Sequence, residues 1–264
     1  METNYYRNYS PALGKDVEMK VYGHAGRPLI FIPCQDGRFY DFENFHMTDT
    51  WAPWIESGQV MVFSIDTIDQ ETWSNQYGDA HWRICRYEQW INYITDEVVP
   101  FAREMVNERN GWTGYPGVMV FGCSLGATHA ANLYFRRPDL FDGLLALSGI
   151  YTAEYGFGDY MDDLVYMNSP IHYLANMPED HPYIDLYNRK KGIICVGQGP
   201  WERPESTRQL HEIFERKHIG VWVDYWGLDC AHDLDWWYQQ VEYYAPFLLG
   251  RPEESELTEE AEEA

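Results

Sequence analysis

The sequence predicts an α/β protein with a mostly parallel central sheet and helices on both faces. Three observations support this fold class. Short, continuous apolar runs such as PLIFIP (28–33) fit strands that are covered on both faces. The longer stretches between such runs repeat apolar residues at three- and four-residue spacing, which indicates helices. The two patterns alternate along most of the chain, as they do where helices connect parallel strands.

The first elements follow from local patterns. An apolar residue at every second position predicts a half-buried edge strand over 16–23. After PLIFIP we expect a loop, CQDGRFYDF. A short helix is predicted over 48–58, with Thr48 or Asp49 near its N-cap, and a strand over 59–66.

The elements beyond residue 66 continue the alternation. A long helical pattern spans about 79–109 and contains Pro100, which we expect to kink or divide the helix. The remaining predicted strands are 117–122, 144–150, 191–198 and 220–227, and the remaining predicted helices are about 124–135, 205–218 and 234–249.

The domain organisation is predicted to be simple. Residues 1–250 fit a single domain. Segment 151–190 has no long period and is rich in Tyr, Asp, Asn, Met and Pro, so we expect a small cap-like insertion over the sheet and the active site. Segment 251–264 carries seven glutamates and one arginine, which predicts a solvated acidic tail.

Charge and cysteine content exclude several classes of protein. The formal net charge of −23 makes nucleic acid a poor partner and disfavours an anionic membrane surface. The five cysteines are odd in number and form no C-x-x-C pair, which argues against a disulfide framework or structural zinc. The N-terminus has no apolar signal region and no run approaches a membrane span, so we expect a cytoplasmic protein. A chain whose leader has been removed would look the same.

The chemistry is concentrated in Gly122-Cys123-Ser124-Leu125-Gly126, which fits G-x-S-x-G at a strand-to-helix turn. Such a turn, the nucleophile elbow, lifts a serine out of the sheet edge and needs small residues on both sides. Ser124 is therefore a candidate nucleophile, and the backbone N–H of Leu125 a candidate oxyanion donor. The alternative is that Ser124 only caps the helix.

A serine nucleophile needs a base and an orienting acid, which follow it in the order serine, acid, histidine. Of the nine histidines, His232 alone lies just after a late predicted strand. Glu202 is the first carboxylate after strand 191–198 and is the candidate acid. Three other carboxylates remain alternatives: Glu205, Asp229 and Asp233.

The second oxyanion donor is expected in the loop after PLIFIP. We predict the backbone N–H of Gln35, with Asp36 as the next choice, and Gly37 would let this loop bend close to the elbow. Residues near the predicted site in sequence are candidates for substrate binding: Asp36, Phe39, Tyr40, Tyr151, Tyr155, Trp201 and Trp236. Aromatic walls suit an aryl ester or the face of a sugar.

At these motifs the chain resembles the esterase branch of the α/β-hydrolases. It is similar to esterase D, the feruloyl esterases and the mycobacterial mycolyltransferases, and most of all to a bacterial putative esterase family. The segments that carry the resemblance cover about 16–249: FIPCQDGRFYDFE, FGCSLGATHA, LSGIYTAEYG, MNSPIHYLANM, CVGQGPWE and WGLDCAHDLDWWYQQ. Many relatives begin the oxyanion loop with His-Gly or Asp-Gly, where this chain has Pro33-Cys34.

The resemblance implies an α/β-hydrolase fold and the same site: Ser124 as nucleophile, His232 as base, Glu202 as acid, and Leu125 and Gln35 as oxyanion donors. We therefore expect a serine esterase that acts on small acyl esters of carbohydrate or aromatic alcohols. The partner would be a small-molecule ester, and a homo-oligomer is left open.

No metal or organic cofactor is expected, because the sequence has no HExxH, P-loop or dinucleotide fingerprint. The alternatives are an acyltransferase with the same triad and a non-catalytic binding protein on the hydrolase fold.

Overall fold

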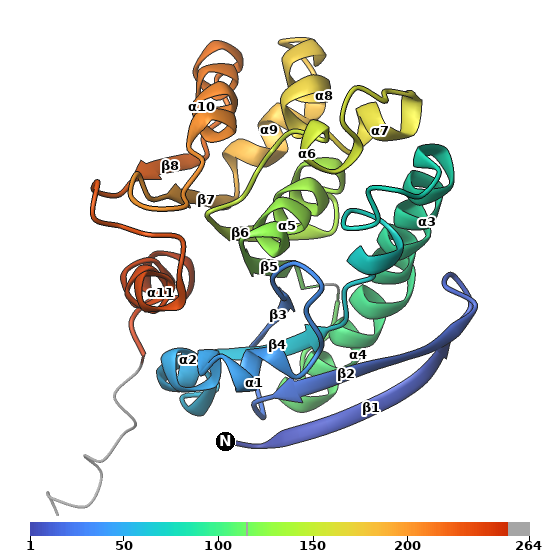
Figure 1. Cartoon of the computed structure of the whole chain (residues 1–264). Coiled ribbons are helices and arrows are strands. Elements are labelled where there is room, and N and C mark those ends of the chain that lie inside the picture. Colours follow the sequence, from blue (N-terminus) through green and yellow to red (C-terminus); the bar gives the residue numbers. More distant parts are fainter. Residues whose placement is uncertain (115, 253–264) are drawn as a thin grey trace, which may run out of the picture.

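A computed structural model describes residues 1–114 and 116–252 of the chain. Its centre is one eight-stranded sheet with the order β1-β2-β4-β3-β5-β6-β7-β8 (Figure 1). The strands from β4 to β8 along this order are parallel, while β1 and β2 are added antiparallel at one edge. The strands are β1 (Thr3–Ser10), β2 (Lys15–Tyr22), β3 (Arg27–Ile32), β4 (Val60–Ile65), β5 (Val118–Cys123), β6 (Phe141–Leu147), β7 (Lys191–Val196) and β8 (Trp222–Tyr225).

Helices cover both faces of the sheet (Figure 1). One face packs against α1 (Asp41–Asn44), α2 (Met47–Glu56) and α11 (Leu234–Leu249). The helices of the other core are α3 (Ala80–Tyr93), α4 (Val99–Asn110), α5 (Leu125–Arg136), α6 (Glu154–Phe157), α7 (Asp163–Met167), α8 (Pro170–Asn176), α9 (Pro182–Asn188) and α10 (Glu205–Lys217). Alternate residues of each central strand enter opposite cores, as Ile30 and Phe31 do, because successive side chains of a strand point to opposite faces. The predicted fold class is confirmed.

The prediction that 16–23 forms an edge strand was wrong. β2 lies between β4 and β1, and β1 is the edge, paired antiparallel from Thr3↔Tyr22 to Ser10↔Lys15. No apolar alternation marks β1, because most of its side chains are exposed. The physical signal that identifies a half-buried strand is therefore missing from its sequence.

The helices differ from prediction in detail. The expected loop after β3 contains α1, and α2 begins at Met47 behind His46, whose φ is 54° and whose side chain forms no cap hydrogen bond. The long helix is divided, as predicted, near Pro100. A π-helix, η2 (Ile94–Val98), separates α3 from α4, which places Pro100 in the first turn of α4, where a missing N–H is tolerated.

Segment 151–190 folds into the four short helices α6 to α9, which sequence periodicity did not reveal. Tyr151, Leu174 and Tyr187 from this segment are fully buried, so it contributes to the core as well as to the surface. Most of the predicted tail, residues 253–264, lies outside the described residues. Within the described part of the chain, no helix combines the length and apolar character that crossing a bilayer requires.

Candidate active site

Ser124 sits at a sharp turn between β5 and α5. Its φ of 56° and ψ of −128° are unfavourable for a side-chain-bearing residue, which is the strained conformation expected of an elbow. Gly122 and Gly126 are both required at this turn, because there is no room for a side chain at either position. A Cβ on Gly122 would lie 2.4 Å from the carbonyl carbon of Gly126, and one on Gly126 would lie 2.3 Å from the backbone oxygen of Ile32.

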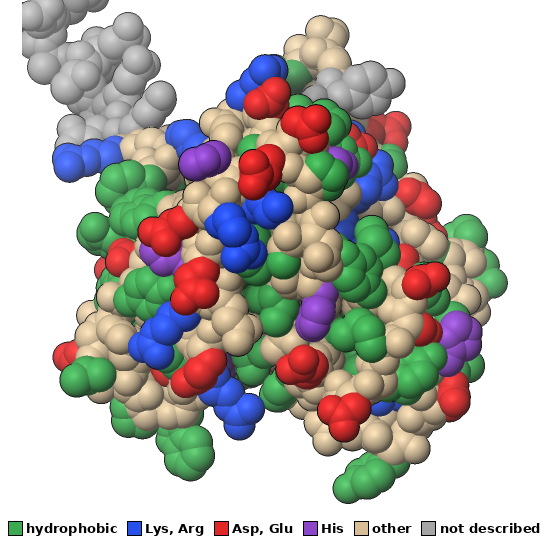
Figure 2. All heavy atoms as spheres, turned by 90° about the horizontal axis from the view of Figure 1, so that it is seen from above, with side chains coloured by type: hydrophobic (Ala, Val, Ile, Leu, Met, Phe, Trp, Pro, Cys, Tyr) green, Lys and Arg blue, Asp and Glu red, His purple; other side chains and the backbone are tan. Residues whose placement is uncertain are grey.

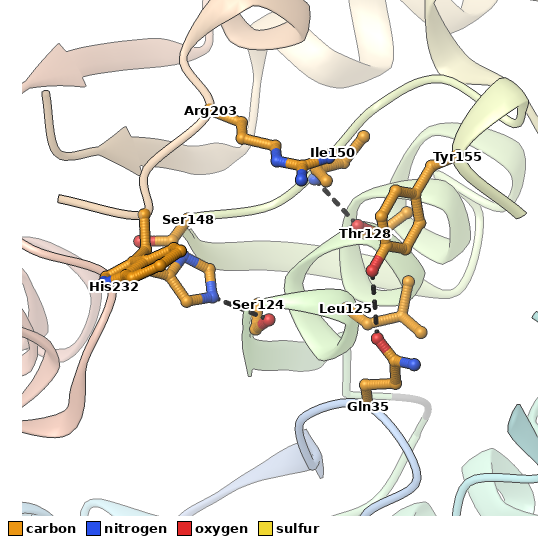
Figure 3. Close-up of a pocket in the computed structure, with 10 residues that line it drawn as sticks. Gln35, Ser124, Leu125, Thr128, Ser148, Ile150, Tyr155, Arg203 and His232 are labelled. Carbon is orange, nitrogen blue, oxygen red and sulfur yellow. Dashed lines mark hydrogen bonds between the residues drawn. The ribbon is translucent and has the colours of Figure 1, made fainter. Parts of the chain in front are cut away.

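The structure brings Ser124, His232 and Glu202 together from three loops that follow β5, β8 and β7. His232 Nε2 lies 2.9 Å from Ser124 Oγ, and His232 Nδ1 lies 3.3 Å from Glu202 Oε2. Figure 3 shows the imidazole directed at the serine hydroxyl. This is the arrangement in which a histidine can take the proton of a serine while a carboxylate fixes its orientation.

Glu202 is well suited to hold one orientation, because its side chain is only 1% exposed. Its Oε1 accepts hydrogen bonds from the Ser148 hydroxyl at 2.6 Å and from the Gly197 N–H at 3.2 Å, so Oε2 is left for His232. The alternative acids have other positions: Asp233 caps α11 through the Trp236 N–H, and Glu205 begins α10.

Two backbone N–H groups beside Ser124 are available to a ligand. Among the described residues, the N–H groups of Leu125 and Gln35 have no protein acceptor. The N–H of Asp36, the other predicted donor, already binds Asp69 Oδ2 at 3.1 Å. Asp36 has a φ of 59° in a tight turn closed by the Gly37 N–H and the Cys34 carbonyl, which presents Gln35 to the site.

Ser124 opens into a cavity of about 270 Å³. This volume is close to the lower end of the range for ligand pockets, about 300–1,000 Å³, so the site favours a small substrate. The lining is mainly polar and comprises Gln35, Ser124, Leu125, Thr128, Ser148, Ile150, Tyr155, Trp201, Arg203 and His232 (Figure 3).

Of the seven residues named as candidates for substrate binding, Tyr155 and Trp201 line this cavity. Asp36 lines a neighbouring cavity on the β2 side of the loop. Phe39 is 7% exposed and packs on Tyr5 and Tyr40, away from the cavity. Two more aromatic candidates have scaffold positions: Tyr151 is fully buried, and Trp236 packs against Trp226.

Several lining residues were not predicted from the sequence. Ser148 and Ile150 follow β6 directly, so their place at the carboxyl edge of a parallel sheet was a usable signal. Thr128 lies one helical turn after Ser124 on α5. Arg203 follows Glu202, but nothing in the sequence distinguishes it from the other arginines.

A metal centre is not apparent in the described parts of the chain. In 1–114 and 116–252, no three residues of the His, Cys, Asp and Glu types are grouped so that they could hold a metal ion.

The structure is similar to several solved α/β-hydrolases. A ferulic acid esterase aligns with a TM-score of 0.70 at 15% identity, over 94% of this chain and 98% of that chain. An S-formylglutathione hydrolase from Agrobacterium tumefaciens aligns with a TM-score of 0.71 at 14% identity, over 95% of each chain. MPT51 from Mycobacterium tuberculosis aligns with a TM-score of 0.62 at 14% identity, over 96% and 99%. At these identities the similarity establishes the fold.

Sequence comparison identifies the family. No curated protein is significantly similar to this chain in sequence. The family model described as "Putative esterase" matches residues 10–225, which is most of the chain and includes the elbow and Glu202. The chain therefore belongs to the putative esterase family and is a carboxylic ester hydrolase of the α/β-hydrolase fold.

Proposed function

We propose that the protein is a serine esterase that hydrolyses small acyl esters of carbohydrate or aromatic alcohols through an acyl-enzyme on Ser124. The observation that carries the proposal is the continuous line of hydrogen bonds from Ser124 Oγ through His232 to Glu202. The small cavity with Trp201 at its wall supports the substrate class, because an aromatic ring can pack on an aryl group or a sugar face.

In the first half-reaction, Ser124 Oγ attacks the ester carbonyl while His232 Nε2 takes its proton. Glu202 stabilises the resulting imidazolium and keeps Nε2 directed at the serine. The tetrahedral oxyanion accepts hydrogen bonds from the N–H groups of Leu125 and Gln35. His232 then returns the proton to the alcohol oxygen, and the alcohol leaves.

In the second half-reaction, water occupies the place of the alcohol. His232 removes its proton as the water oxygen attacks the acyl carbon, and the second tetrahedral intermediate uses the same two N–H groups. Collapse releases the carboxylic acid and returns the proton to Ser124. An oxyanion donor of this kind contributes about 10²–10³ to the rate.

Hydrolysis of p-nitrophenyl esters of increasing acyl length by the wild type and by Ser124→Ala tests the proposal. We expect turnover of short esters that is lost in Ser124→Ala and kept in the control Ser57→Ala, which removes a hydroxyl at the end of α2. A fluorophosphonate probe should label only proteins with Ser124. Turnover that survives Ser124→Ala would overturn the proposed nucleophile.

The acyltransferase alternative is distinguished by the products. With a competing alcohol present, an esterase yields mainly the free acid, whereas a transferase yields mainly the new ester. We expect the free acid to dominate over the whole range of alcohol concentration.

A further inference from the structure

Arg203 brings a positive charge to the wall of the catalytic cavity. It lies in the loop between β7 and α10, one residue after Glu202, and its side chain extends toward Ile150 and Thr128 (Figure 3). Among residues 1–114 and 116–252, the Arg203 guanidinium has no hydrogen-bond or ion-pair partner. A solvent-facing guanidinium with five free donors is a ready binding group for a carboxylate.

Among the described residues, the side chains of Arg189 and Arg216 also have no hydrogen-bond or ion-pair partner, but of these three arginines Arg203 is the one that lines the catalytic cavity. The sequence has 42 acidic residues against 19 Lys and Arg, and acidic side chains are spread over the face shown in Figure 2. Elsewhere arginines find carboxylates: Arg38 pairs with Asp66, and Arg136 pairs with Glu88. Arg203 forms no such ion pair, although it directly follows Glu202, whose carboxylate oxygens bind other donors.

The rest of the cavity wall matches this charge. Among the described residues that line the cavity, none is acidic. Thr128 Oγ1 accepts the Ile150 N–H at 2.9 Å, so its own hydrogen remains available to donate. The Arg203 guanidinium and the Thr128 hydroxyl thus both offer hydrogen-bond donors in the lining of this cavity.

We infer that the ester substrate carries a carboxylate, which pairs with Arg203 while the ester carbonyl lies at Ser124. This inference rests on the proposed function and narrows its substrate class to esters that also carry a carboxylate. Because Arg203 is partly solvated, its contribution is that of a charge-assisted hydrogen bond at a wet site, and we expect a preference of about tenfold in kcat/KM.

The test compares esters that differ only in charge. On the alcohol side, 4-acetoxybenzoate is paired with 4-acetoxybenzamide. On the acyl side, the monophenyl ester of fumarate is paired with its primary amide. The para and trans geometries keep the carboxylate from attacking its own ester, and the amide has nearly the same shape without the charge. The readout is the ratio of kcat/KM for carboxylate over amide in each pair.

Two variants separate this role from general electrostatics. Arg203→Gln removes the charge at the cavity, and Arg203→Lys keeps a charge without the planar fork. The matched control is Arg216→Gln, which removes the same charge from the exposed last turn of α10, away from the cavity. Each protein is also measured in 1 M salt, where the Debye length falls to about 3 Å.

We expect wild type and Arg216→Gln to favour the carboxylate about tenfold in at least one pair, with the larger ratio identifying the side that bears the charge. The ratio should fall toward one in Arg203→Gln, be intermediate in Arg203→Lys, and decrease in 1 M salt. Two results would overturn the inference and leave the esterase proposal intact. One is hydrolysis of the amide-bearing esters with no preference for the carboxylate-bearing ones, and the other is a carboxylate preference that Arg203→Gln retains. Failure of the wild type to hydrolyse any of the four esters would overturn both.

Discussion

Asp69 Oδ1 lies 2.9 Å from His129 Nε2, and this contact joins two parts of the site that are 60 residues apart in sequence. His129 is on α5, the helix that begins after Ser124, and Asp69 follows β4. The other carboxylate oxygen of Asp69 accepts the Asp36 N–H in the turn that presents Gln35. Both side chains are almost completely buried, so the link is shielded from water.

The direction of the hydrogen bonds in this link follows from its partners. Burial raises the pKa of Tyr87 far above its usual value, so its phenol keeps its hydrogen and donates it to His129 Nδ1, which lies 2.8 Å away. His129 Nε2 then carries the hydrogen that Asp69 accepts. The helix of the nucleophile and the oxyanion turn are thereby fixed to one another through a single carboxylate.

Asp69→Asn should therefore lower kcat by about tenfold or more for p-nitrophenyl acetate. An amide has one accepting oxygen and cannot serve both donors, so the turn and the Gln35 N–H shift from the position that an oxyanion would occupy. Steady-state kinetics would show a fall in kcat larger than any rise in KM. The control is Asp142→Asn, which removes a carboxylate paired with Arg27 away from the site. A folded Asp69→Asn protein with the kcat of the wild type would limit Asp69 to a structural role.

Glu202→Gln should lower kcat by orders of magnitude, up to about 10⁴, while the protein stays folded. The amide group would place a donor among the Ser148 hydroxyl, the Gly197 N–H and the His232 ring, all of which now meet an acceptor. The imidazole would lose its fixed tautomer. Kinetics with p-nitrophenyl acetate and circular dichroism test this together, with Glu205→Gln as the control. Wild-type rates in Glu202→Gln would transfer the orienting role to another carboxylate.

The central strands were predictable because they are buried on both faces, so each is a continuous apolar run whose ends mark the sheet edge. The elbow and the order serine, acid, histidine then directed attention to Ser124, Glu202 and His232, which the structure brings together. Each of these predictions depended on a signal that lies within a few residues of the residue that it identifies. The edge strand β1 had no such signal, because its exposed side chains leave no alternation.

The parts that were not predicted depend on contacts between distant segments. Nothing near Asp69 or His129 in the sequence indicates that they pair, and aromatic residues close to the motifs were expected at the cavity whether or not their side chains point into it. Phe39 and Tyr151 pack into the scaffold instead. Direction of a side chain in a loop is set by tertiary packing, which local patterns do not encode.

Gly126→Ala should destabilise the protein by about 1–3 kcal/mol or more and abolish turnover. The added Cβ would lie 2.3 Å from the Ile32 oxygen and 2.4 Å from the Pro33 oxygen, and backbone atoms cannot rotate out of the way. Thermal melting and ester hydrolysis measure the two effects. The control is Gly220→Ala, whose new Cβ would meet the side chain of Asn188 at 3.1 Å. Equal melting temperatures for the two variants would contradict the close approach of α5 to β3.

Cys34 should be unreactive toward iodoacetamide at pH 8 in the folded protein. Desolvation of the half-buried Cys34 side chain, with a smaller effect of the Asp41 carboxylate, raises the pKa of its thiol to about 12, and only the thiolate is alkylated. Ionisation in the folded state therefore begins far above pH 8, whereas in the unfolded chain it begins near the ordinary thiol value. Peptide mass spectrometry should show rapid modification of Cys34 in urea only. Rapid modification of the folded protein would contradict the raised pKa of the Cys34 thiol.

Trp201→Gly should raise KM for aryl esters severalfold with little change in melting temperature. Trp201 lines the cavity but is 88% exposed, so its side chain stabilises the fold very little. Its φ of 68° is a left-handed conformation that glycine adopts without strain, which offsets the extra freedom that glycine gives the unfolded chain. Trp201→Phe, which keeps an aromatic ring, should restore most of the affinity. If KM for naphthyl acetate is the same in Trp201→Gly and the wild type, the ring does not contact the substrate, and the aromatic part of the substrate proposal loses its main support.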